Sequence, residues 1–378
     1  MFGIRSLRSL AIMAALAVTA VSGCAAEDGV IDTEAGKIKF ETVAKGLAHP
    51  WGLAFLPDGS FLVTERPGRL RLVSKTGEVS KPLTGVPEVF AEGQGGLLDV
   101  ALDPDFASNR LVYLSYSEPG EGGAGTAVAR GKLADGGLEN LEVIFRQEPK
   151  VGGGNHFGSR LAFAPDGKLF ITLGERFTFT PAQDLSNDLG KIVRINPDGS
   201  VPDDNPFVGQ KGARPEIWSY GHRNPQGAAI NPSSGKLWES EFGPWGGDEL
   251  NIPQAGRNYG WPVVSWGKHY DGTRIPAPPT HPEFADAIAH WTPVISPSGI
   301  AFYTGDSIPA WKGNLLIGGL SSEALVRLTL DGETVKAEER IPMGTRIRDV
   351  AQAPDGSVYL LSDEDDGKVL RLTLEKAG

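Results

Sequence analysis

One motif recurs six times along this 378-residue chain: a short apolar run, a turn rich in Pro, Asp and Gly, and a second apolar run. "LAFLPDGSFLVTE" and "LAFAPDGKLFITLGE" show it most clearly. Pro presets φ, Asp hydrogen-bonds its own turn and Gly accepts a positive φ, so each copy is typical of a β-hairpin. The copies begin at six positions: Leu53, Val100, Leu161, Ala228, Ile300 and Val350.

The spacing of the copies predicts the architecture. Successive copies start 47, 61, 67, 72 and 50 residues apart, and each interval has room for four strands and their loops. The 50 Gly and 28 Pro residues, about a fifth of the chain, indicate many tight turns. We therefore predict an all-β protein, a six-bladed β-propeller over residues 39–378. The last strand, "KVLRLTL", is expected to close the ring against "IKFETVAKG".

The N-terminus is typical of a bacterial lipoprotein. "MFGIRSLRSLAIMAALAVTAVSGC" has a basic start, an apolar run too short to span a bilayer, and small residues before Cys24. We expect residues 1–23 to be a lipoprotein signal peptide, Cys24 to carry lipid, and residues 24–38 to form a short tether. The alternative is an ordinary signal peptide with an incidental cysteine. The expected location is the periplasmic side, anchored to the outer membrane through Cys24.

Charge and cysteine content exclude several kinds of partner. The formal net charge is −11, and removing Arg5 and Arg8 with the signal makes it about −13. This balance argues against a nucleic-acid partner and against an anionic membrane surface, which leaves the lipid anchor as the only expected membrane contact. Cys24 is the only cysteine, so no intramolecular disulfide can form.

Unusual polar residues stand at matching places beside the hairpins, in segments that a propeller gathers at one end of its channel. They are Gln94, Asn155, His156, His222, Arg223, Asn224, Arg346 and Arg348, with the segments "EFGPWGGDELN" and "GGLSSEALVRL". Each also has a purely structural explanation. His156 could be a hydrogen-bonded turn residue, Arg223 could pair with an acid, and the two later arginines alternate as strand residues do.

Several motifs carry a resemblance to a known family. In order, "NHFGSRLAFAPDG", "GHRNPQG", "GPWGGDELN", "RNYGWP" and "RIRDV" resemble the soluble quinoprotein aldose dehydrogenases, the glucose/sorbosone dehydrogenase family. The resemblance spans Glu41 to Leu374 and is greatest to bacterial periplasmic aldose sugar dehydrogenases. It implies a six-bladed propeller that uses pyrroloquinoline quinone (PQQ) and Ca²⁺. It further implies oxidation of an aldose at C1 to the lactone, with electrons passing to a quinone or a soluble carrier.

The resemblance also assigns roles to residues. His156 would be the general base, with Arg223 beside it over the quinone. Carbonyls of Gly243 and Pro244 would ligate the Ca²⁺ on the quinone, and Glu249 and Tyr259 a second, structural Ca²⁺. The PQQ-binding positions would be Gln94, Arg223, Asn224, Tyr270, Ser321, Arg346 and Arg348.

One position departs from the family pattern, because Ser321 stands where a PQQ-binding Lys is common. Arg176 is a candidate to supply the missing charge. Two alternatives remain open: a six-bladed Ca²⁺-dependent lactonase, and a non-catalytic propeller that binds carbohydrate or protein. The arginines argue against the lactonase, since a single-metal hydrolase does not need several cations, whereas Ser321 keeps the second alternative open.

Overall fold

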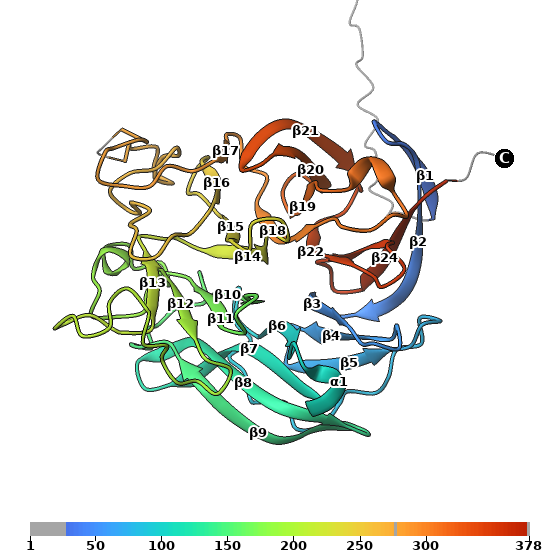
Figure 1. Ribbon diagram of the computed structural model, residues 1–378, viewed down its shortest axis with the longest axis horizontal. Helices are drawn as coiled ribbons and strands as arrows, with labels where there is room; N and C mark the ends of the chain where they lie inside the picture. Colours follow the sequence, from blue (N-terminus) through green and yellow to red (C-terminus); the bar gives the residue numbers. More distant parts are fainter. Residues whose placement is uncertain (1–27, 276–277, 376–378) are drawn as a thin grey trace, which may run out of the picture.

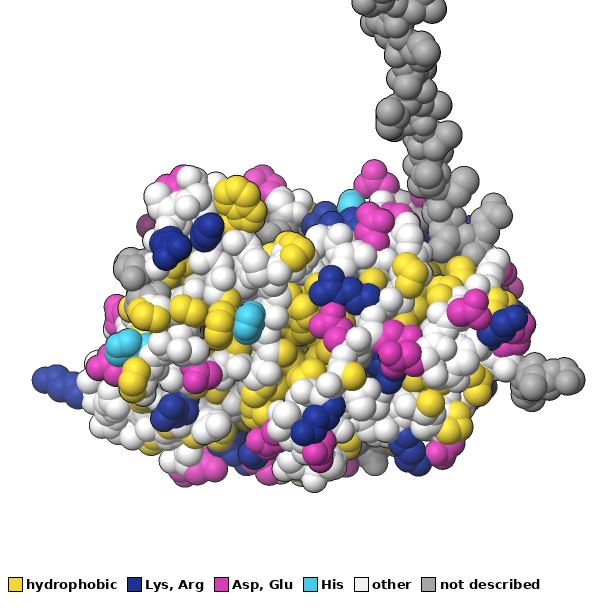
Figure 2. Space-filling model, turned by 90° about the horizontal axis from the view of Figure 1, so that it is seen from above, with side chains coloured by type: hydrophobic (Ala, Val, Ile, Leu, Met, Phe, Trp, Pro, Cys, Tyr) yellow, Lys and Arg dark blue, Asp and Glu magenta, His cyan; other side chains and the backbone are white. Residues whose placement is uncertain are grey.

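Six β-sheets surround a central axis in the computed structural model, which describes residues 28–275 and 278–375 (Figure 1). No helix in these ranges is long and apolar enough to cross a membrane. Figure 2 shows one edge of the ring, where acidic and basic side chains are interspersed among apolar and neutral ones. The negative net charge is therefore not gathered on this face.

The first three blades follow one another along the chain. The first has three strands: β3 (Pro50–Phe55), β4 (Phe61–Glu65) and β5 (Arg69–Val73). The second has four strands and a short helix: β6 (Leu97–Leu102), α1 (Phe106–Asn109), β7 (Leu111–Gly120), β8 (Gly123–Ala134) and β9 (Gly137–Arg146). The third has four strands and a 3₁₀ turn: β10 (Gly158–Phe163), β11 (Leu169–Leu173), η1 (Thr180–Gln183), β12 (Lys191–Ile195) and β13 (Ile217–Tyr220).

The remaining blades complete the ring. The fourth has four strands: β14 (Pro225–Ile230), β15 (Leu237–Glu241), β16 (Asp248–Asn251) and β17 (Ala289–Trp291). The fifth adds a 3₁₀ turn: β18 (Pro297–Phe302), η2 (Pro309–Trp311), β19 (Leu315–Gly319), β20 (Ala324–Asp331) and β21 (Thr334–Pro342). The sixth joins both ends of the chain: β22 (Ile347–Gln352), β23 (Val358–Ser362), β24 (Gly367–Leu374), β2 (Gly36–Leu47) and β1 (Gly29–Thr33).

The six predicted hairpins are the first two strands of the six blades, so the six-bladed propeller is confirmed. In each blade the register shifts near the start of the first, innermost strand. Such bulges bend a strand and re-aim its side chains, and they are common beside active sites. Among the predicted site residues, Gln94, His156 and Asn224 stand in the segments directly before these strands.

Ring closure is confirmed, but the predicted start of the propeller is wrong. β2 pairs with β24, with Ile38 opposite Leu374 and Leu47 opposite Gly367. The sheet begins at Gly29 rather than at residue 39, because β1 and β2 form a hairpin around a tight turn. There Gly36 takes φ 107° and its carbonyl accepts a 2.7 Å hydrogen bond from Thr33 Oγ1. Cys24 and the predicted signal peptide lie outside the described residues.

Apolar clusters between neighbouring blades form the core. Trp238 of β15 is fully buried among residues of the fifth blade, including Ile300 and Ile317. Trp311 is likewise buried, with Ile347 and other residues of the sixth blade. These tryptophans pack between blades, as expected of residues beside strands.

A buried arginine occupies the axis. Arg160, in β10, places Nη1 3.0 Å from Oδ1 of both Asp99 (β6) and Asp349 (β22). Its Nε donates to the Gln226 carbonyl at 2.8 Å, and its guanidinium lies 4.1 Å from the centre of the Trp51 ring. One side chain thus links its own blade to the first, second, fourth and sixth.

Glycines make room for this network. The third residue of each innermost strand is Gly, Asp or Arg, in the order Gly52, Asp99, Arg160, Gly227, Gly299 and Asp349. A Cβ at position 299 would lie 1.9 Å from Asp349 Oδ1, and one at position 52 would lie 2.7 Å from Asp99 Oδ1. Side chains at these glycines would therefore displace the carboxylates that hold Arg160.

We predict that Arg160→Met lowers the free energy of unfolding by about 3–5 kcal/mol, because two buried carboxylates lose their cation. The pKa values of Asp99 and Asp349 should then rise further. The loss in free energy of unfolding should therefore be larger at pH 8, where these carboxyl groups are driven to ionise, than at pH 5. Denaturant unfolding at the two pH values measures this. Arg340→Met, at a side chain that is 45% exposed, is the matched control and should change little.

Candidate active site

Three of the predicted segments meet at the mouth of the channel. The Oε1 atom of Gln94 accepts hydrogen bonds from the backbone N of His156 at 2.9 Å and from Nδ2 of Asn224 at 3.4 Å. Asn224 Oδ1 in turn accepts from the backbone N of Gly158 at 3.1 Å. Segments of the second, third and fourth blades are therefore joined at His156, as the sequence predicts.

His156 forms a dyad with Glu175. Nδ1 of the buried imidazole lies 2.5 Å from Glu175 Oε1, and Glu175 Oε2 accepts the backbone N–H groups of Thr178 at 2.5 Å and Phe179 at 2.7 Å. A carboxylate can only accept, so the proton lies on Nδ1 and Nε2 keeps a lone pair. In the described part of the chain no hydrogen bond is made to Nε2.

Glu175 was missed at the sequence level, where only the neighbouring Arg176 was considered. The signal that points to it is chemical: a histidine base needs a group that orients its other ring nitrogen. Burial lowers the pKa of His156, and nearby Arg223 and Arg176 lower it further, whereas the hydrogen bond to Glu175 opposes them. A lowered pKa favours the neutral form of the His156 imidazole at pH 7.

Arg176 does not supply the charge missing at Ser321. Its guanidinium lies 3.6 Å from the centre of the Phe157 ring and donates to the carbonyls of Asn155 and Gly153, the latter at 2.6 Å. The side chain is buried, and burial lowers its pKa to about 10. Arg176 thus holds the glycine-rich segment that carries His156, and both of its Nη atoms are occupied by carbonyls of that segment.

Arg223 is buried beside this dyad. Its Nη1 donates to the carbonyls of Phe242 at 3.0 Å and Gly243 at 2.8 Å, and Nη2 donates to the Tyr270 hydroxyl at 3.0 Å. Its Nε is buried without a partner among the described residues. Glu241 Oε2 accepts the backbone N–H of Arg223 at 2.6 Å, which fixes the segment that carries the guanidinium.

The four predicted metal-binding residues line a single small cavity of about 10 Å³, together with Arg223 and Glu241. They are Gly243, Pro244, Glu249 and Tyr259. Glycine is required at position 243, because a Cβ there would lie 2.2 Å from the Gly247 carbonyl oxygen. The residues expected to form two separate Ca²⁺ sites thus line the same cavity.

An acidic cluster adjoins this cavity. Ligand atoms of His222, Glu239 and Glu241 lie within 4.8 Å of one another, and Glu239 Oε2 and Asn251 Oδ1 are buried without a hydrogen-bond partner among the described residues. Burial and repulsion from Glu241 raise the pKa of Glu239 to about 7 and that of Glu249 well above its ordinary value. Such unsatisfied oxygens suit a hard cation. The sequence analysis did not identify Glu239 or Glu241.

The remaining predicted residues make their hydrogen bonds and ion pairs to other partners. Arg348 is buried, and its Nη atoms are bound by Asp363 Oδ2 at 2.5 Å and Gln226 Oε1 at 2.7 Å, so it is not the free cation that was expected. Arg346 is half exposed, 3.7 Å from Asp363. Ser321 is exposed, with Oγ donating to the Val294 carbonyl at 3.3 Å. In the described ranges no hydrogen bond or ion pair joins Arg346 or Ser321 to His156 or Arg223.

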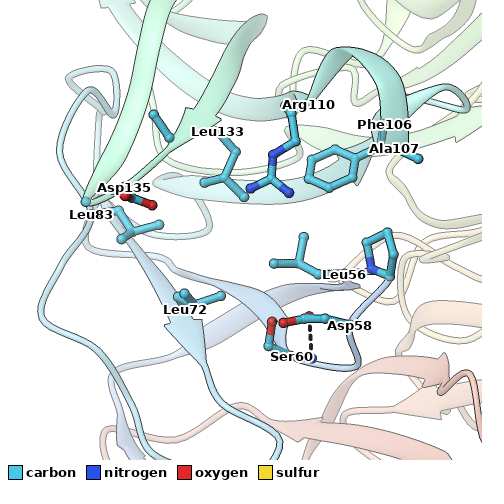
Figure 3. Close-up of a pocket in the computed structure, with 13 residues that line it drawn as sticks. Leu56, Asp58, Ser60, Leu72, Leu83, Phe106, Ala107, Arg110, Leu133 and Asp135 are labelled. Atoms are coloured by element: carbon cyan, nitrogen blue, oxygen red, sulfur yellow. Dashed lines mark hydrogen bonds between the residues drawn. The ribbon is translucent and has the colours of Figure 1, made fainter.

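Another cavity, of about 530 Å³, lies between the first two blades at the opposite ends of their inner strands (Figure 3). Leucines and Phe106 line much of it, and Arg110 lies over the Phe106 ring at 4.8 Å. Asp58, an acidic residue in the lining of this cavity, accepts a 2.6 Å hydrogen bond from the hydroxyl of Ser60 in the same turn. It holds no base with an orienting partner, so the candidate active site is the one at His156.

A family model described as glucose/sorbosone dehydrogenase matches residues 47–371. The chain belongs to this family.

Relatives within the glucose/sorbosone dehydrogenase family cover nearly the same length. The chain is 48% identical to the aldose sugar dehydrogenase YliI of Escherichia coli over 349 residues, which cover 89% of this chain and 93% of the relative. The apo-form structure of the soluble E. coli aldose sugar dehydrogenase superposes with a TM-score of 0.88 at 47% identity, covering 89% of this chain and all of that one. The structure of the PQQ-bound aldose sugar dehydrogenase from Streptomyces coelicolor superposes with a TM-score of 0.73 at 34% sequence identity. The match covers 89% of this chain and 98% of that one.

These findings confirm the resemblance read from the motifs. They place the chain among the oxidoreductases that act on CH–OH groups of sugars. They favour this class over the lactonase and the non-catalytic propeller.

We predict that His156 titrates below its ordinary value of about 6.5. Glu175→Gln should lower its pKa further, because the carboxylate that favours the imidazolium is lost. Histidine-selective NMR across pH 4–8 measures both shifts. The partly exposed His281 supplies a second histidine signal that aids assignment of the His156 resonance. A His156 that titrates above 7 would contradict its assignment as a neutral base.

Proposed function

We propose that this protein oxidises aldose sugars at C1 to the lactone, with PQQ as cofactor, Ca²⁺ as metal and His156 as general base. The observation that carries the proposal is the His156–Glu175 dyad, whose free Nε2 lies beside Arg223 in a member of this family. The names of the relatives support the substrate class, and the PQQ-bound Streptomyces structure supports the cofactor.

The residues around the channel mouth suit a planar tricarboxylate. Arg223, with its unpaired Nε, and half-exposed Arg346 would supply cations, and the amides of Gln94 and Asn224 would supply hydrogen bonds. Exposed Tyr270 would line the same pocket. When bound, PQQ supplies a two-electron acceptor for the hydride from C1, and Ca²⁺ makes it more electrophilic.

Ca²⁺ is the cation that best suits the cavity at Gly243. The nearby donors are carboxylates and carbonyls, the oxygen ligands that a hard cation prefers. Glu249, Glu241 and the Gly243 carbonyl are the ligands we would assign. Arg223 donates to that carbonyl in the structure, so its Nη1 would move aside or share the oxygen.

The protein's own part in the reaction is proton transfer and positioning. His156 Nε2 takes the proton of the C1 hydroxyl, and the carboxylate of Glu175 stabilises the imidazolium that results. The Thr178 and Phe179 N–H groups hold that carboxylate in place. Burial of the imidazole keeps it neutral before the sugar binds.

Reconstitution with PQQ and Ca²⁺ tests the activity. We expect aldose-dependent reduction of a dye acceptor by the wild type. His156→Ala should lose about a hundred- to ten-thousand-fold in kcat, because the base is absent, while PQQ binding stays unchanged. His281→Ala, at a partly exposed histidine, is the control. Lactone hydrolysis without dye reduction, or full turnover by His156→Ala, contradicts the proposal.

Binding of Ca²⁺ can be tested separately from activity, through its effect on the free energy of unfolding. Ca²⁺ at a hundredfold excess over its Kd should raise the unfolding free energy of the chelator-treated protein by about 2.7 kcal/mol. Glu249→Gln should be more stable than the wild type without metal, because carboxylate repulsion is relieved, yet gain little from Ca²⁺. Glu283→Gln, 78% exposed, is the control. Equal Ca²⁺ stabilisation of the wild type and Glu249→Gln would argue against the site.

We also propose that Cys24 carries a lipid that anchors the protein on the periplasmic side of the outer membrane, and that a quinone or soluble carrier accepts the electrons. The "VSGC" sequence supports the anchor. Cys24→Ser should move the protein from the membrane to the soluble fraction of cells. Equal fractionation of both forms would refute the anchor.

A further inference from the structure

Exposed aromatic side chains are concentrated at the mouth of the site. In the described part of the chain six large apolar side chains are at least 40% exposed: Val30, Phe177, Val208, Trp245, Val263 and Tyr270. The three aromatic ones, Phe177, Tyr270 and Trp245, all lie in segments that contact or adjoin Glu175, Arg223 or Gly243. Grouped exposed apolar surface in a folded protein usually marks a binding region.

Phe177 is the one of these that contacts the proposed base. Its ring centre lies 5.1 Å from that of His156, edge to face at 74°. The Tyr270 ring is 6.3 Å away and close to parallel, at 29°. Phe179 packs behind Phe177 at 5.2 Å, so the exposed ring has a fixed support.

The backbone at Phe177 is strained. Arg176, Phe177 and Phe179 take φ values of 59°, 61° and 64°, a left-handed conformation that bulky residues rarely adopt. The Glu175 carboxylate stabilises the loop by accepting two of its N–H groups. Strain of this kind persists where the surrounding structure over-determines it, commonly at ligand-binding sites. Here the strained loop keeps a phenyl ring 41% exposed beside the base.

We propose that Phe177, with Tyr270, is the wall against which the ring of an aldopyranose packs while its C1 hydroxyl meets His156. This inference rests on the proposed function and names the part of the substrate that the chain recognises. The faces of a pyranose carry C–H bonds, and its equatorial hydroxyls point outward in the ring plane. An aromatic face therefore suits the ring, and the polar groups around His156 suit the hydroxyls. Phe177 would select pyranoses over short, open-chain aldoses.

The experiment uses the PQQ- and Ca²⁺-loaded protein with glucose as substrate and 1,5-anhydro-D-glucitol as inhibitor, a pyranose that lacks the reactive hydroxyl. Phe177→Ala should raise KM and the inhibitor's Ki together by about tenfold. The kcat value, the pH profile of kcat and the Kd of PQQ should stay unchanged. Phe177→Tyr, which keeps the aromatic face, should restore both constants. Val208→Ala, at a side chain 43% exposed and outside the site, should leave them unchanged.

Failure of this inference is distinguishable from failure of the proposed function. If the wild type reduces dye but Phe177→Ala leaves KM and Ki unchanged, the sugar ring does not pack against Phe177, and the proposed function is unaffected. A change in PQQ affinity, or a shifted pH profile with unchanged Ki, would show that Phe177 supports the cofactor or His156, which also overturns the inference. If the wild type oxidises no aldose, the proposed function falls, and this inference falls with it.

Discussion

The ion network around Arg160 is the constraint on which the centre of the molecule depends. Buried charges are costly unless their partners are well placed, and here two carboxylates, three carbonyls and an indole face surround one guanidinium. Burial raises the pKa of Asp349 to about 6, and the charge of Arg160 opposes that rise. Since His156 stands four residues before Arg160, the network also fixes where the third blade presents the His156 imidazole.

Two charged clusters flank Arg223, and Glu241 connects them. One oxygen of Glu241 holds the backbone of Arg223 and Asn224, and the other faces His222. On the other side, Asn224 reaches Gln94, which also binds the backbone of His156. The acidic cluster and His156 are therefore connected through short chains of hydrogen bonds. The proposed metal and the proposed base would then be positioned by the same framework.

Features that repeat along the chain or form locally, such as the hairpins, could be predicted from the sequence. Side-chain partners that depend on contacts between blades could not. The six Pro-Asp-Gly-type turns predicted six blades, and the apolar last strand predicted the closure with β2. The motif order predicted that Gln94, His156 and Asn224 meet. Glu175 and Glu239 escaped notice because an acid becomes a partner only when the fold brings it to a base or a cation. For the same reason Arg176 and Arg348 looked like free cations, although carbonyls and a carboxylate bind their donors.

The pairing of β2 with β24 has a consequence for how the ring is made. Strand β24 completes the sixth blade by pairing with β2 from the opposite end of the described chain, so a nascent chain that stops before β24 cannot close the ring. Until then the 12-residue β2 has one unpaired edge, a template to which other chains could add. Contacts between residues so distant in sequence form slowly. The pairing of β2 with β24 thus closes the finished ring, but the nascent chain is vulnerable to aggregation until that pairing forms.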